Sequence, residues 1–178
     1  MYVDNYPVVL VHAQAPLTST PEGACGYIDA DMHDPDQILA AAAQTLDFTR
    51  PVGGMLVGVM QFAGEIGEAR QIIDRLMAAC PSGSYLTISH PASDIYAEQF
   101  GEATRRFNEA APESERMTLR DHATVASLFS GFDLVPPGLV RVASRCADSE
   151  PRLPDQEPCG PASPASARRL IPGDRQWS

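Results

Sequence analysis

Two short apolar stretches near the start of the chain each end in polar side chains. Asp4 and Asn5 follow the first stretch, and Asp31 ends the second. A carboxylate at the end of a strand can accept hydrogen bonds from both vicinal hydroxyls of a ribose, and its charge strengthens each bond. Asp4 is therefore a candidate ribose ligand. A turn aspartate, or a helix cap shared with Asn5, explains the same position equally well.

Asp31 and Met32 have the chemistry to hold a base such as adenine. The carboxylate can accept a hydrogen bond from an exocyclic amino group, and the thioether side chain can pack on the ring face. A loop aspartate that precedes a helix is the simpler reading, and position alone slightly favours it.

His90 is the candidate catalytic residue, because an imidazole titrates near neutral pH and can act as a general base. It ends an apolar stretch and precedes Pro91, so closing a strand is the alternative. The remaining histidines and the four cysteines have no ligand-like spacing and no CxxC, so we predict no metal site.

The elements that must position these residues follow from the apolar patterns. We expect strands over 1–4, 26–31, 51–62 and 84–90, and helices over 6–15, 35–44, 66–79, a segment marked by Tyr96 to Phe107, and 121–130. Residues 132–142 predict two short strands around a Pro-Pro turn. This alternation predicts a doubly wound α/β domain, in which ligands bind at the carboxyl ends of the strands, including Gln61 and Phe62.

Composition narrows the class of protein and of partner. The 178 residues carry a net charge of −10, and all 13 basic residues are arginine. An acidic balance disfavours nucleic acid and anionic membranes as partners. No apolar run approaches the roughly 18–20 residues of a membrane span, and no signal peptide is visible, so we expect a cytoplasmic protein. The oligomeric state stays open.

The pattern changes near residue 147. Residues 147–178 hold six of the 16 prolines and lack apolar periodicity. We therefore expect a domain over 1–146 and a Pro/Arg-rich, disordered tail over 147–178.

Several motifs together resemble a known family. YVDNYPVVLVHAQAPLTSTPEG and YIDADMHDPDQIL, then RPVGGMLVGVMQF, GSYLTISH and GFDLVPPGLV, follow one another in the order and spacing found in it. The chain, over about residues 1–145, resembles the S-adenosylmethionine-dependent methyltransferase family formerly catalogued as a domain of unknown function.

The resemblance implies a class I methyltransferase fold, Rossmann-like and doubly wound, with S-adenosylmethionine as cofactor and an unknown methyl acceptor. By position, Asp4 with Asn5 would hold the ribose, and Asp31 with Ala30 and Met32 would line the adenine pocket. The end of the 51–62 strand, with Gln61 and Phe62, would face the methionyl part and the substrate.

The sequence departs from the family in two respects. Gln61 stands where the family usually has histidine before the phenylalanine. The family's first strand and its Gly-rich loop have no counterpart, and its last strand is not recognisable. We therefore expect an incomplete sheet in an N-terminally truncated member.

Two alternatives remain. A nicotinamide-dependent oxidoreductase would also place an acidic residue at the end of the second strand. The Asp29-Ala30-Asp31 strand end and the Asp34-Pro35 helix start, which match the methyltransferases, disfavour it. A non-catalytic remnant, or a fragment that binds a partner chain, would also explain the missing strand.

Overall fold

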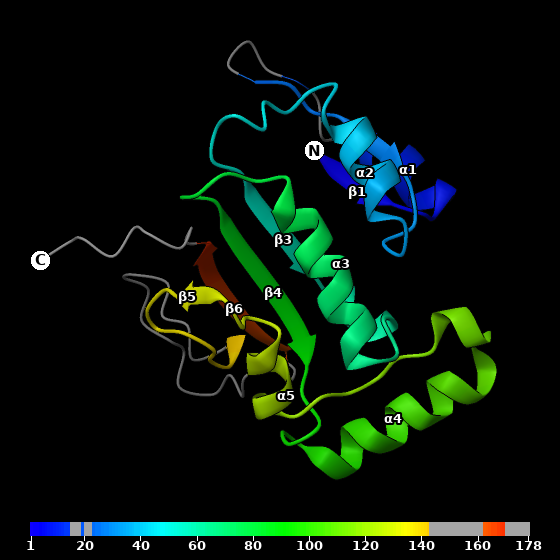
Figure 1. The fold of residues 1–178 in the computed structure, drawn as a ribbon. Helices are drawn as coiled ribbons and strands as arrows, with labels where there is room; N and C mark the ends of the chain where they lie inside the picture. The colour runs from blue at the N-terminus through cyan, green and yellow to red at the C-terminus, as the bar shows by residue number, and fades with distance from the viewer. Residues whose placement is uncertain (15–18, 20–22, 143–161, 170–178) are drawn as a thin grey trace, which may run out of the picture.

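The computed structural model describes residues 1–14, 19, 23–142 and 162–169. Strands and helices alternate along most of the chain (Figure 1). The elements are β1 (Tyr2–Asp4), α1 (Pro7–Gln14), β2 (Tyr27–Asp29), α2 (Pro35–Ala42), β3 (Gly53–Val57), the 3₁₀ helix η1 (Met60–Phe62), α3 (Ile66–Ala78), β4 (Tyr85–Pro91), α4 (Ala97–Ala110), the 3₁₀ helix η2 (Glu113–Glu115), α5 (His122–Ser127), β5 (Phe132–Leu134) and β6 (Ala162–Arg169).

The strands form two separate sheets. β1 and β2 pair in parallel, with Asp4 opposite Asp29. The second sheet has the order β3-β4-β6-β5, in which β3 and β4 are parallel and β6 runs antiparallel to both of its neighbours. Among the described residues, no backbone ladder joins β1 to β3. The parallel strands and their helices confirm the α/β class expected from the sequence.

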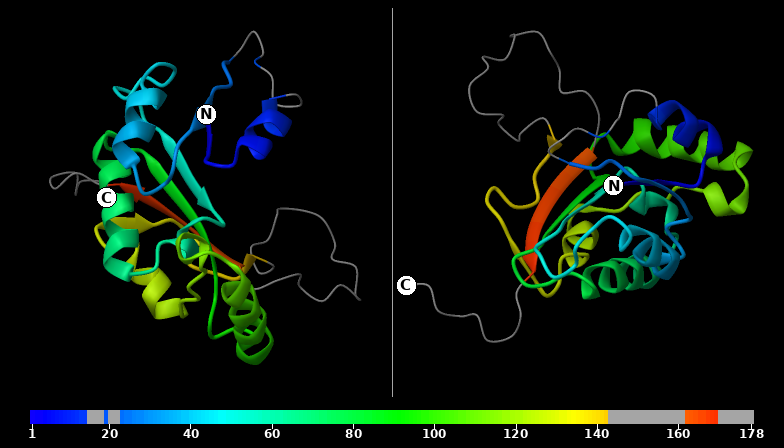
Figure 2. Two further views of the ribbon diagram at one scale, coloured as in Figure 1. Left: turned by 90° about the vertical axis from the view of Figure 1, so that its right-hand side faces the viewer. Right: turned by 90° about the horizontal axis from the view of Figure 1, so that it is seen from above.

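Local sequence explains where the helices begin and which faces they bury. Asp34 caps α2 by accepting a hydrogen bond from the Gln37 backbone N–H, and Pro35 occupies the first turn. α3 buries one stripe at helical spacing, namely Ala69, Ile72, Ile73 and Met77. α2, α3 and α5 lie on one side of the strands, and α1 and α4 lie on the other (Figure 2).

Two apolar clusters make up the core. The larger packs α3 against β4 and the segment after α5, with Ile73, Leu86, Ile88 and Leu128 almost fully buried. The smaller lies between β2 and α2 around Ile28 and Ile38. Phe48, in the loop before β3, and Leu76, on α3, pack against both clusters. Their side chains therefore connect the cores of the two sheets.

Most expected elements are present; β1, β2 and β3 are shorter than the pattern predicts, and β4 has the expected length, displaced by one residue. The apolar run 51–62 divides into β3 and η1. In the segment 132–142 only β5 forms; a turn closed by a bond from the Gly138 N–H to the Val135 carbonyl follows it.

The expectation of a disordered tail is wrong for residues 162–169. They form β6, which pairs with β4 from Tyr85 to Pro91 and with β5. The sequence of this strand shows no apolar alternation that would predict it. It forms where the free edges of β4 and β5 offer backbone hydrogen-bond partners. The other residues of the expected tail, 147–161 and 170–178, lie outside the described residues.

No helix in the described part of the chain is long and apolar enough to cross a membrane.

Candidate functional site

The carboxyl ends of β1 and β2 bring four of the predicted site residues together. The Asn5 side-chain amide donates to Asp31 Oδ2 at 3.2 Å, and the Asp4 carbonyl accepts from the Ala30 N–H at 3.3 Å. Asp4 Oδ1 accepts from the Tyr6 backbone N–H at 2.8 Å. This bond shapes the turn into α1 and leaves Asp4 Oδ2 without a partner among the described residues. One carboxylate oxygen is thus available at the strand end.

The second carboxylate, Asp31, is more fully engaged. Its Oδ1 accepts from the backbone N–H of His33 at 2.9 Å and contacts His33 Nδ1 at 2.5 Å. The backbone bond from His33 is the main cause that lowers the pKa of Asp31, and the His33 ring and Asn5 act in the same direction. Asp31 is therefore a charged acceptor held in a fixed orientation. An adenine amino group that donated to Asp31 would therefore accept the same carboxylate oxygens as partners that already bind His33 and Asn5.

Ala30 and Met32, the neighbours of Asp31 in the sequence, both pack against apolar clusters of the core. Ala30 is buried in the cluster beneath α2, and Met32 is half-buried against the larger core cluster. The pair offers a small, apolar contact next to a charged acceptor, which suits a flat ring with an edge amino group.

Gln61 and Phe62 lie in η1, directly after β3. Gln61 is 8% exposed, and its Nε2 donates to the Gly58 carbonyl at 2.6 Å. Its Oε1 is the buried side-chain atom without a hydrogen-bond partner among the described residues. Phe62 is half-buried.

A chain of hydrogen bonds connects the two groups of strand ends. The Tyr6 hydroxyl lies 3.4 Å from both carboxylate oxygens of Glu115. Three residues later, the Thr118 N–H donates to the Gln61 carbonyl at 2.8 Å. The segment 115–118 therefore spans from the end of β1 to the end of β3, although their strands belong to different sheets.

His90 does not have the surroundings of a general base. It is fully buried, its Nδ1 lies 2.8 Å from the Pro91 carbonyl, and its Nε2 lies 2.8 Å from a guanidinium nitrogen of Arg120. Since the guanidinium can only donate, Nε2 accepts and Nδ1 carries the proton. Burial lowers the pKa of His90 to about 4, and the Arg120 charge acts in the same direction. A neutral imidazole with both nitrogens engaged cannot reach a substrate proton, so the structure does not support the predicted catalytic role.

Arg120 is the residue that the sequence analysis missed. It is 4% exposed and donates to the carbonyls of Met60, Ala63 and Gly64 in addition to His90. The guanidinium thus fixes the loop after β3 to the end of β4. Nothing in the segment LRDH, which reads as a polar surface loop, distinguishes this arginine from an exposed one.

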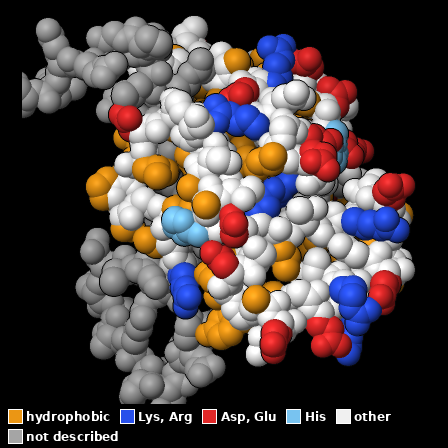
Figure 3. All heavy atoms as spheres, turned by 60° about the horizontal axis from the view of Figure 1, so that its bottom comes forward, with side chains coloured by type: hydrophobic (Ala, Val, Ile, Leu, Met, Phe, Trp, Pro, Cys, Tyr) orange, Lys and Arg blue, Asp and Glu red, His pale blue; other side chains and the backbone are white. Residues whose placement is uncertain are grey.

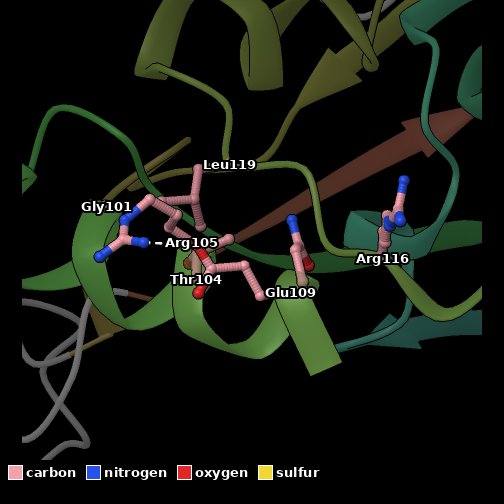
Figure 4. A pocket seen from close by; sticks show the side chains of 7 residues that line it. Gly101, Thr104, Arg105, Glu109, Arg116 and Leu119 are labelled. Atoms are coloured by element: carbon pink, nitrogen blue, oxygen red, sulfur yellow. Dashed lines mark hydrogen bonds and ion pairs between the residues drawn. The ribbon is translucent and has the colours of Figure 1, made fainter. Parts of the chain in front are cut away.

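A shallow depression of about 640 Å³ lies elsewhere, beside α4 (Figure 4). Arg105, which is paired with Glu109, lines it together with Arg116 and Leu119. Acidic and basic side chains are interspersed over the face seen in Figure 3. None of the predicted site residues lines this depression, so the strand ends remain the candidate site.

Solved structures confirm the fold. A protein of the DUF574 family from Streptomyces avermitilis MA-4680 is 36% identical, with a TM-score of 0.85, over 95% of this chain and 64% of that chain. A candidate methyltransferase from Thermobifida fusca YX is 28% identical, with a TM-score of 0.77, over 96% of this chain and 62% of that one. The present chain therefore spans less than two thirds of the length of either relative.

A more distant structure shares the fold alone. Human N-acetylserotonin methyltransferase, solved in complex with SAM, is 14% identical with a TM-score of 0.52 and is matched over 40% of its length by 96% of this chain. Comparison with curated proteins gave no match. The family model for S-adenosyl methyltransferases matches residues 1–166 and so extends into β6. The chain belongs to the S-adenosyl methyltransferase family.

Proposed function

We propose that this chain binds S-adenosylmethionine at the carboxyl ends of β1 and β2 and serves methyl transfer to an acceptor of unknown identity. The observation that supports the proposal most directly is the available Asp4 Oδ2 beside the Asn5–Asp31 pair. Family membership favours this reading over a nicotinamide-dependent oxidoreductase.

The residues present fit the adenosine half of the cofactor. Asp4 would accept hydrogen bonds from the ribose hydroxyls, and Asp31 would accept from the adenine amino group, with Ala30 and Met32 against the ring. When bound, S-adenosylmethionine supplies an activated methyl group, so the protein contributes mainly orientation. Gln61 and Phe62, at the end of β3, would lie nearer to the reacting centre.

Arg120 and His90 act as positioning residues in this proposal. By fixing the carbonyls of Met60, Ala63 and Gly64, the guanidinium sets the path of the loop that carries Gln61. An amine or thiol acceptor suits a site of this kind, because such nucleophiles need only deprotonation and no strong base.

Calorimetry with S-adenosylhomocysteine tests the proposal. We expect Asp4→Asn to weaken binding about tenfold or more, because it removes the charge from the ribose acceptor. The amide keeps an oxygen for the Tyr6 N–H, so the turn is retained. Asp133→Asn, an exposed aspartate on β5, is the matched control and should bind as the original chain does. A cooperatively folded chain without measurable binding would refute the proposal, and equal affinities of the two variants would refute the role of Asp4.

A further inference from the structure

His33 lies in the turn between β2 and α2, beside the carboxylate of Asp31. Its Nδ1 lies 2.5 Å from Asp31 Oδ1, the same oxygen that accepts from the His33 backbone N–H at 2.9 Å. An ionised carboxylate only accepts hydrogen bonds, so Nδ1 carries a proton and donates to it. Two donors of one residue therefore converge on one oxygen of the candidate adenine ligand.

The turn does not require the contact from the imidazole. Other bonds close it, because the Asp34 N–H donates to the Asp31 carbonyl at 3.0 Å and the His33 N–H donates to Oδ1. The side chains of His33 and Asp31 are 36% and 50% exposed, and a pair this exposed contributes little to the free energy of unfolding. What the imidazole changes is the hydrogen-bonding capacity left on the carboxylate.

The imidazole also faces a second carboxylate. Its Nε2 lies 3.7 Å from Oε1 of Glu68, in the first turn of α3. This distance exceeds a hydrogen bond and makes an ion pair when the ring is protonated. Protonation of Nε2 leaves the proton on Nδ1 in place, so Nδ1 donates to Asp31 in both protonation states of the ring.

The carboxylate of Asp31 has one acceptor position left among the described residues. An ionised carboxylate offers about four such positions, two on each oxygen. His33 fills both positions on Oδ1, and the Asn5 amide fills one on Oδ2 at 3.2 Å. The position that remains is on Oδ2.

A single free position on Oδ2 suits a 6-amino purine and rejects a 6-oxo purine. Adenine can donate one amino N–H to it. Hypoxanthine has a carbonyl oxygen at the place of the amino group, and that oxygen cannot donate to Oδ2. Its nearest donor is the N1–H, which needs another free position on the carboxylate, and His33 occupies both positions on Oδ1. The unpaired polar groups would weaken binding of the 6-oxo base.

We propose that His33 makes the base pocket selective for adenine over 6-oxo purines by saturating Oδ1 of Asp31. This inference rests on the proposed binding of S-adenosylmethionine at the ends of β1 and β2. His33 is a positioning residue in it, because the imidazole acts through Asp31 and not on the cofactor directly.

Calorimetry with two ligands tests the inference. S-adenosylhomocysteine carries the 6-amino group, and S-inosylhomocysteine carries a 6-oxo group in its place. We expect the original chain to bind the adenosyl ligand about thirtyfold or more tightly than the inosyl ligand. In His33→Phe the ratio should fall to about fivefold or less, because one position on Oδ1 becomes free for the N1–H. Most of the change should be a gain in affinity for the inosyl ligand.

Three further variants separate selectivity from a structural role. His33→Ala also lacks the side-chain donor and should behave as His33→Phe does. His33→Asn places an amide nitrogen near the position of Nδ1 and should keep the ratio of the original chain. His12→Phe makes the same exchange at an exposed position on α1 and should keep it too. A purely structural His33 would weaken both ligands equally and leave the ratio unchanged.

The outcomes distinguish this inference from the proposed function. If the original chain binds S-adenosylhomocysteine and the folded His33→Phe and His33→Ala variants keep the original ratio, the role of His33 is overturned and the proposed function stands. Loss of selectivity in His33→Asn as large as in His33→Phe would also overturn that role. If the folded original chain binds neither ligand, the proposed function is refuted and the inference falls with it.

Discussion

Acidification tests the assignment of His90 as a buried, neutral partner of Arg120. In the folded chain burial lowers the pKa of His90 to about 4, from an ordinary value of 6.5. The unfolded chain therefore binds a proton on this imidazole at a higher pH than the folded chain does. The stabilisation by the neutral imidazole is complete above pH 6.5 and is lost as the pH falls towards 4.

The magnitude follows from the two pKa values. One pH unit of difference is worth about 1.4 kcal/mol, so the interval between 6.5 and about 4 corresponds to roughly 3 kcal/mol in full. At about pH 5 most of this interval has been crossed, and the expected loss is about 2 kcal/mol. Such a loss is large beside a typical unfolding free energy of about 5–15 kcal/mol.

Urea denaturation at about pH 7.5 and about pH 5 measures this difference. The carboxylates whose pKa is lowered from 3.8, which are Asp31, Asp47 and Asp121, lose their contributions only below that value and do not interfere. His90→Asn should remove most of the pH dependence between the two conditions, whereas His12→Asn, at an exposed position on α1, should retain it.

Two results would refute the reasoning. Equal stability of the original chain at both pH values would show that His90 is not held neutral by burial. An NMR signal assigned to the His90 imidazole that titrates near pH 6.5 in the folded chain would show the same, even if His90→Asn fails to fold.

Other predictions concern Arg120 and a helix cap. Arg120→Lys should lower the free energy of unfolding by about 2 kcal/mol or more, because an ammonium group cannot donate to the three carbonyls and His90 Nε2 together. Urea denaturation at neutral pH measures this loss, and an unchanged free energy of unfolding would contradict the structural role of Arg120. Asp121→Ala should cost about 1 kcal/mol, since its carboxylate accepts from the Thr124 N–H and caps α5. Asp133→Ala, on β5, is a control for this measurement and should stay near zero.

Periodicity and helix-start chemistry placed most elements correctly from the sequence. The Asp34-Pro35 start of α2 and the apolar stripe of α3 depend on neighbours within a few residues, so local sequence is sufficient to predict them. The same reasoning placed Asp4, Asn5 and Asp31 at strand ends, and parallel pairing of β1 with β2 is enough to bring them together.

β6 and the environment of His90 required the tertiary structure. β6 forms through backbone pairing with β4 and β5, strands that are distant in the sequence, and its own residues show no strand pattern. His90 becomes a buried acceptor because Arg120, thirty residues away, lies against it. The sequence places a titratable group at a strand end but does not show whether that group faces solvent or a guanidinium.

The sequence by itself thus determined the α/β class, the family resemblance and the carboxylates at the ends of β1 and β2. These features depend on local patterns and on residue order. Only the tertiary structure decided that residues 162–169 pair with β4 and β5 as β6, that Arg120 fixes the loop after β3, and that His90 is neutral. Each of these depends on burial and on contacts between distant segments, which set the free energy of a charge or an unpaired backbone group.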